Sequence, residues 1–183
     1  MSVRSGKGDK GFTDLISKQH VSKDSASIRA IGNLDELNCH IGLIKTKIRR
    51  RKEKEILERI QRAIYIIASE IAIGAEEKRK HGPILRQEDA DWVKSVVYEL
   101  EEKVKIKNYF YTPGESELSA IIDIARTVAR RAERSVVGLF KKEKFRDENI
   151  LSYLNCISDI LFIMARESAP KKSVKKRKTR KKK

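Results

Sequence analysis

Apolar residues recur every three or four positions along five segments of the chain, which cover residues 28–48, 57–71, 93–104, 118–140 and 151–164. This spacing places the apolar side chains on one face of an α-helix. No segment shows the strict alternation of a β-strand. The pattern therefore predicts five amphipathic helices with short connections, packed as a helical bundle.

Turn and capping residues set the expected ends of these helices. Gly74 follows the second segment and predicts its end. The fourth helix is expected to begin after Pro113 and Gly114, with Glu115 and Glu117 in its first turn, where acidic groups favour the helix dipole. The fifth is expected to lie between an Asp147 cap and Pro170.

Three segments fall outside the predicted helices: a polar, glycine-rich stretch at 1–25, a basic connection at 78–87 and an aromatic connection at 105–114. An ordered stretch of about 25 residues without a helix is uncommon in a compact domain unless it binds something or docks on the core. Residues 1–25 are therefore a candidate binding loop.

Charge separates a folded body from a basic tail. The chain has 183 residues, of which 39% are hydrophobic and 37% charged, and this composition excludes a wholly disordered protein. The net charge is +16, but residues 169–183 hold ten basic residues and no acid. We expect a single domain over 1–168 and a disordered basic tail over 169–183. The tail leaves open an alternative function, binding of nucleic acid or another polyanion.

The cysteines and the hydropathy of the chain indicate its cellular location. Cys39 and Cys156 are the only cysteines, and their spacing fits neither a zinc site nor a disulfide framework. No run approaches 18 apolar residues, and the N-terminus has no apolar core of a signal peptide. The sequence predicts a cytoplasmic protein without a membrane span or a protein-bound metal.

The first candidate for chemistry is the glycine-rich stretch from Gly6 to Gly11. Glycines allow successive backbone N–H groups to turn toward one anion, and Lys7 and Lys10 add positive charge. A flexible terminus is an equally good reading of these residues. The stretch is not a Walker loop, because the Gly-Lys-Ser/Thr ending is missing.

The second candidate is an arginine cluster in the fourth helix. Arg126 and Arg130 are four residues apart and share a face with Glu133, while Arg131 and Arg134 lie on a neighbouring face. Guanidinium groups suit phosphate recognition because they donate paired, planar hydrogen bonds. Ion pairs with acids on adjacent helices are the structural alternative, and both can hold for different arginines.

Polar residues beside the apolar stripes suggest a cleft between helices, formed by Asn155, Ser158 and Asp159 with Asp35 and Asn38. The three histidines share no spacing, and no serine or cysteine is placed as a nucleophile. The aromatic run around Phe110 is either packing or a wall for a flat ligand.

Six motifs together resemble the ATP:cob(I)alamin adenosyltransferases that form trimers of helical bundles. They are GDKG at 8–11, VSKD at 21–24, GNLDELN at 32–38, PG at 113–114, ARTVARRAER at 125–134 and YLNCISDILF at 153–162. The match runs in order over residues 4–166. It implies an all-α, five-helix, ferritin-like bundle whose active site lies between neighbouring subunits of a homotrimer.

The resemblance also implies roles for individual residues. Phe110 would lie under the corrin ring and exclude its lower axial ligand, and Arg126 would pair with Asp35 across the subunit boundary. The implied ATP-binding residues are Ser5, Gly6, Lys7, Gly8, Thr13, Asp14, Lys23, Arg130, Glu133, Arg134 and Asn155.

The implied reaction needs no protein nucleophile. A reductase converts four-coordinate cob(II)alamin to cob(I)alamin, whose cobalt attacks C5′ of ATP, and triphosphate leaves with Mg²⁺. The chain departs from the family pattern at Ser5-Gly6-Lys7, His20, Glu115, Asp123 and Cys156. A relative that binds ATP or adenosylcobalamin without turnover is therefore kept as a further alternative.

Overall fold

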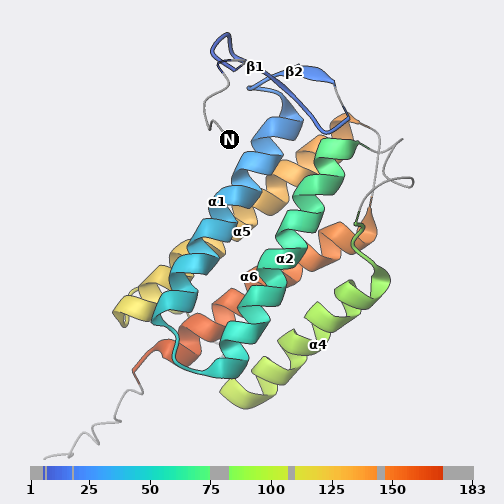
Figure 1. Cartoon of the computed structure of the whole chain (residues 1–183). Helices are drawn as coiled ribbons and strands as arrows, with labels where there is room; N and C mark the ends of the chain where they lie inside the picture. Colours follow the sequence, from blue (N-terminus) through green and yellow to red (C-terminus); the bar gives the residue numbers. More distant parts are fainter. Residues whose placement is uncertain are drawn as a thin grey trace, which may run out of the picture.

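The structure is a computed structural model that describes residues 6, 8–17, 19–74, 83–106, 110–143 and 147–170. The five predicted helices are confirmed in this part of the chain (Figure 1). They are α1 Ala26–Lys47, α2 Arg51–Ile73, α4 Gln87–Val104, α5 Glu117–Lys142 and α6 Glu148–Ser168.

The helices form an up-and-down bundle in which α5 packs between α1 and α6. Helix α2 packs against α1, and α4 against α6. Successive helices run in opposite directions, as the short connection 48–50 between α1 and α2 requires. The last turn of α1 therefore meets the first turn of α5, where Lys47 Nζ donates to Glu117 Oε1 at 2.8 Å.

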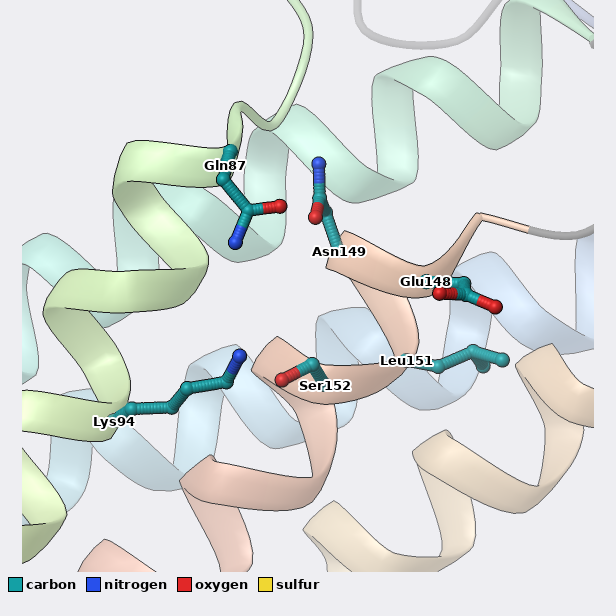
Figure 2. A pocket seen from close by; sticks show the side chains of 6 residues that line it. All are labelled: Gln87, Lys94, Glu148, Asn149, Leu151 and Ser152. Carbon is teal, nitrogen blue, oxygen red and sulfur yellow. The ribbon is translucent and has the colours of Figure 1, made fainter.

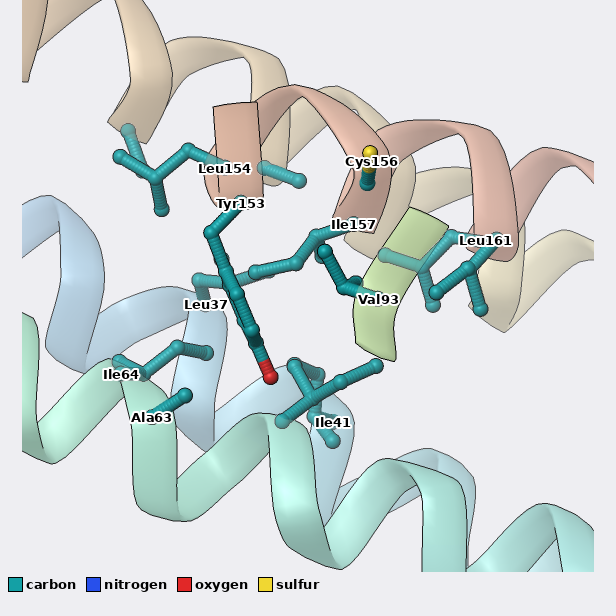
Figure 3. Close-up of a cluster of buried hydrophobic side chains, with 14 of the residues drawn as sticks. Leu37, Ile41, Ala63, Ile64, Val93, Tyr153, Leu154, Cys156, Ile157 and Leu161 are labelled. Atoms are coloured by element: carbon teal, nitrogen blue, oxygen red, sulfur yellow. The ribbon is translucent and has the colours of Figure 1, made fainter. Parts of the chain in front are cut away.

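The core is built from the apolar stripes that define the helices in the sequence. Its fully buried members include Leu34, Leu37, Ile41, Ile60, Ile64, Val93, Ile122 and Ile157. Figure 3 shows the Tyr153 ring lying among them, with its hydroxyl directed toward α2. This hydroxyl is buried without a hydrogen-bond partner among the described residues, and burial strongly raises its pKa. Burying a polar group without a hydrogen-bond partner lowers the free energy of unfolding by about 1–3 kcal/mol.

Capping residues fix where the helices begin and end. Gly74 ends α2 with a φ of +82°, and Asp147 Oδ1 accepts hydrogen bonds from the backbone N–H groups of Asn149 and Ile150. The sequence places the start of α5 too early, with Glu115 in the first turn. Ser116 is the cap, so Glu117 lies in the first turn and Glu115 precedes the helix.

The N-terminal segment contains two short strands that the sequence pattern did not predict. β1 Phe12–Asp14 pairs antiparallel with β2 His20–Ser22. Strands of three residues are too short to display a period of two. The backbone N–H of Ser17 donates to the carbonyl of Ala72, so the hairpin is attached to the end of α2.

None of the described helices is long and apolar enough to cross a membrane. The predicted site residues Ser5 and Lys7 lie outside the described residues, as do positions 171–183 of the basic tail.

Candidate functional site

The glycine-rich turn brings Lys23 against the backbone of Gly8. The backbone N–H of Gly11 donates to the Gly8 carbonyl, and the N–H of Lys23 donates to the Gly11 carbonyl at 2.9 Å. A Cβ added to Gly8 would lie 2.7 Å from Lys23 Nζ. Gly6 and Gly11 adopt positive φ values of 69° and 82°, which favour glycine. The turn thus presents an exposed backbone and an ammonium group at the same place.

The hairpin beside this turn is held by its own side chains. His20 and Asp14 form a hydrogen bond of 2.7 Å between Nδ1 and Oδ1, and the Phe12 ring stacks on His20 at 5.2 Å. Asp14 is therefore already engaged within the hairpin. Thr13 is half-buried at its centre.

The four arginines of α5 fall into two pairs with different surroundings. Arg126 Nε donates to Asp123 Oδ1 at 3.1 Å, and Arg131 forms an ion pair with Glu36 of α1. Arg130 and Arg134 are exposed and form no hydrogen bond or ion pair with any described residue. Arg126 and Arg131 are thus paired with acids of the same chain, whereas Arg130 and Arg134 are free to bind an external anion.

Helix α6 contributes polar groups next to Arg130. Burial raises the pKa of Asp159, the charge of Glu101 raises it further, and the charge of Arg130 opposes this shift. Asn155 is exposed one turn earlier on the same helix. Arg130 of α5 and Asp159 of α6 therefore interact electrostatically, with Asn155 one turn from Asp159 on α6 and the half-buried Glu133 one turn from Arg130 on α5.

No described cysteine beside these residues has the character of a nucleophile. Burial and the nearby Asp159 carboxylate raise the pKa of the Cys156 thiol, so the thiolate is disfavoured. The described residues also contain no cluster of three or more His, Cys, Asp or Glu side chains that could hold a metal ion.

A second set of predicted residues lies at the other end of the bundle. Phe110 is fully exposed on the connection that precedes α5. Beside this connection, a groove of about 330 Å³ is lined by Pro113, Gly114, Ala120, Asp123, Ile124, Arg126 and Thr127. Since α1 has 22 residues, it spans about 33 Å. Gly8 precedes the start of α1 and Phe110 lies near its end, so one chain keeps them far apart.

Asp35 and Asn38 lie in a different groove, between α1 and α2. This groove has a volume of about 280 Å³ and is mostly apolar, with Ile28, Ile31, Gly32, Ile64, Tyr65 and Ala68 as its other lining residues. Asp35 is exposed and forms no ion pair with a described residue. The expectation of one polar cleft that joins Asp35 and Asn38 to Asn155, Ser158 and Asp159 is not met in this groove, because its lining comes from α1 and α2 and includes no residue of α6.

Figure 2 shows a third groove, between the first turns of α4 and α6, with a volume of about 420 Å³. Lys94 of α4 extends toward Ser152 of α6, and Gln87, Glu148, Asn149 and Leu151 complete the lining. This groove is not predicted by the sequence. These residue types are common on any helical surface, so no motif marks them.

The chain is similar to known proteins in both sequence and structure. The sequence model of the cobalamin adenosyltransferase family matches residues 3–168. A corrinoid adenosyltransferase of Bacillus subtilis is 33% identical over 170 residues, which cover 91% of this chain and 86% of the relative. Corrinoid adenosyltransferase PduO of Salmonella typhimurium is 30% identical over 166 residues, and this chain spans only 49% of its length.

Solved structures give the same result. A variant PduO-type ATP:corrinoid adenosyltransferase of Lactobacillus reuteri, complexed with cobalamin and ATP, superposes with a TM-score of 0.82 at 29% identity. The superposition covers 90% of this chain and 92% of that one. Because the match extends over nearly the whole helical body, the chain belongs to the cobalamin adenosyltransferase family.

Proposed function

We propose that this protein transfers the 5′-deoxyadenosyl group of ATP to the cobalt of a reduced corrinoid and releases triphosphate. The observation that carries the proposal is the division of the α5 arginines. Arg126 and Arg131 are paired within the chain, whereas Arg130 and Arg134 are exposed and form no ion pair with a described residue. Unpaired guanidinium groups on a rigid helix can donate directly to phosphate oxygens without first breaking an internal ion pair.

The glycine-rich turn is the second part of the proposed nucleotide site. Lys23 Nζ is held over the backbone of Gly8, so an ammonium group and backbone N–H groups can face one phosphate chain. Mg²⁺ would enter with ATP. Because the described residues contain no metal-binding cluster, the phosphate oxygens and water would supply most of its ligands.

Phe110 is proposed to lie against the lower face of the corrin ring. Its side chain is fully exposed and apolar, which suits contact with a flat, bulky ligand. By excluding a lower axial ligand it would favour four-coordinate cobalt(II), to which a partner reductase adds one electron. The cobalt(I) electron pair then forms the bond to C5′ while the C5′–O bond breaks toward triphosphate. The role of the chain is to orient the two reactants and to neutralise the leaving group.

Assembly into a homotrimer is part of the proposal. Within one chain Gly8 and Phe110 lie at opposite ends of the bundle, so a site that uses both requires a second copy. Charge supports the same arrangement. Two guanidinium groups, of Arg126 and Arg166, share the single carboxylate of Asp123, and Asp35 is an unpaired acid on another face. Pairing of Asp35 with a neighbouring Arg126 would neutralise this cluster.

The proposal is tested by incubating the protein with ATP and chemically reduced cobalamin, and following the absorbance change on Co–C bond formation. We expect multiple turnovers. Binding of both substrates without product would favour the non-catalytic alternative, and the proposal would then fail. The free cysteines Cys39 and Cys156 are consistent with the proposed cytoplasmic location.

A further inference from the structure

Arg166 is a buried cation that contacts two functional regions from the last turn of α6. Its side chain is only 4% exposed. Its Nη2 donates to Asp123 Oδ2, and the other oxygen of Asp123 accepts from Arg126. The guanidinium carbon lies 5.1 Å from the centre of the Tyr111 ring and 5.4 Å from that of Phe162. Arg166 thus joins the groove of Arg126 to the residue that follows Phe110.

The aromatic contacts fix the start of the 110–116 connection. Tyr111 and Phe162 meet edge to face with ring centres 5.8 Å apart, and Arg166 lies against both rings. Cation–π contacts strengthen when the cation is removed from water, as it is here. The far end of the connection is held separately, because Ser116 Oγ donates to the carbonyl of Ser168. Both anchors are on the end of α6, and Phe110 lies just outside them.

We infer that Arg166 is a positioning residue that sets the location of Phe110 through Tyr111 and that of Arg126 through Asp123. The inference rests on the proposed function, since it concerns how Phe110 is held for corrinoid. Asp123 is essential to this arrangement, because a fully buried guanidinium needs an opposite charge. The Phe110 side chain is fully exposed in the described part of the chain, so its place depends on how the neighbouring Tyr111 is held.

The test compares Tyr111→Leu with Tyr111→Phe, because both leave the buried ion pairs intact and only the first removes the ring. Hydrogen exchange of the free protein is measured over 110–116. We expect faster exchange in Tyr111→Leu and in Arg166→Met, no change in Tyr111→Phe, and no change in the hairpin at 12–22 in any variant.

Activity provides the second readout. With mild reduction of cobalt(II), Tyr111→Leu is expected to lose about 100-fold in rate, as small misplacements of reacting groups do. KM for ATP should remain the same, and pre-formed cobalt(I) should restore most of the rate. The loss should not add to that of Phe110→Ala in the double variant. Arg166→Lys keeps a charge for Asp123 but not the planar contact with Tyr111, and should show the same loss.

These outcomes separate the inference from the proposed function. If the wild type forms no Co–C bond, the proposed function fails. If Phe110→Ala is impaired while Tyr111→Leu exchanges and reacts like the wild type, only the inference is overturned. Additive losses in the double variant would likewise contradict it, since they would show that Tyr111 acts independently of Phe110.

Discussion

Lys23 Nζ occupies the space directly above Gly8, where a Cβ would lie 2.7 Å away. A side chain at position 8 would therefore displace the flexible end of Lys23, although Gly8 has no positive φ. The backbone at Gly8 accepts other residues, and the effect of a substitution falls on the position of the Lys23 ammonium group.

Gly8→Ala should therefore act through Lys23. The added methyl pushes the flexible ammonium group aside and removes a charge-assisted contact with phosphate, so KM for ATP should rise about tenfold with little change in melting temperature. Initial rates at varied ATP measure this. In a Lys23→Ala background the same change should have no further effect; an equal loss there would show that the methyl acts on the turn itself. Gly138→Ala is the control, because a Cβ there meets nothing within 4 Å.

Arg130→Ala should reduce kcat/KM for ATP by about 10- to 100-fold, the value of one charge-assisted hydrogen bond to phosphate. Arg131→Ala is the matched control on the next residue, since Arg131 is paired with Glu36 within the chain. It should lose some stability but keep its kcat/KM. Steady-state kinetics of the folded variants show whether Arg130 contacts ATP. Equal kcat/KM values for the two variants would remove Arg130 from the proposed site.

Asp35→Ala should weaken both the trimer and the reaction. In the proposed assembly it leaves the neighbouring Arg126 cluster with an uncompensated, largely buried charge, which costs about 3–5 kcal/mol. Sedimentation velocity over a concentration series measures the trimer. Glu36→Ala, which alters an exposed pair within the chain, should leave assembly unchanged. A wild type that is active as a monomer would contradict the proposed interface.

Glu167 should make the bundle lose stability in acid. Burial alone would raise its pKa, but hydrogen bonds from Lys103 and Arg50 outweigh burial and lower the pKa below 4.5. The stabilisation is therefore complete above the ordinary pKa and is lost as the pH falls through the lowered, folded-state value. Glu167→Gln should cost about 1–2 kcal/mol of unfolding free energy at pH 7.

Denaturant unfolding of Glu167→Gln at pH 7 and in acid tests the sign. The difference from the wild type should shrink as the pH is lowered, and a difference that grows in acid would refute the assigned pKa direction. Glu102→Gln is the control, because Glu102 is exposed on α4 and forms no ion pair with a described residue.

Removal of residues 171–183 distinguishes the enzyme from a polyanion-binding protein. These residues have no apolar periodicity and carry only positive charge, so we expect the melting temperature and adenosyl transfer to stay nearly unchanged. Binding of a nucleic acid should fall, with a weaker dependence on salt. Loss of adenosyl transfer in the truncated protein would assign the tail to the active site.

The helices could be predicted from the sequence because their apolar stripes and caps are local signals. Gly74 ends α2 and Asp147 begins α6 by contacts within four residues. The hairpin at 12–22 could not, since its three-residue strands are stabilised by the His20–Asp14 contact and by attachment to α2.

The candidate site could be predicted only in part, because some of its contacts join residues that are far apart in the sequence. Arginines spaced along α5 indicate anion binding, but the sequence does not reveal which of them are neutralised by neighbours. Asp123 lies one turn before Arg126 and accepts a hydrogen bond from it. Asp123 also accepts a hydrogen bond from Arg166, which is 43 positions away in the chain. The contact of Arg166 with Tyr111 depends on how α6 packs, so no motif marks it.

The most direct test of adenosyl transfer is a single turnover with ATP labelled with ¹³C at C5′, mixed with the trimer and cobalt(I) corrinoid. NMR of the products should show the labelled carbon bonded to cobalt and intact triphosphate in equal amount. Release of phosphate or diphosphate while the label remains on an unattached nucleotide would contradict the account, because the protein would then hydrolyse ATP rather than transfer its adenosyl group.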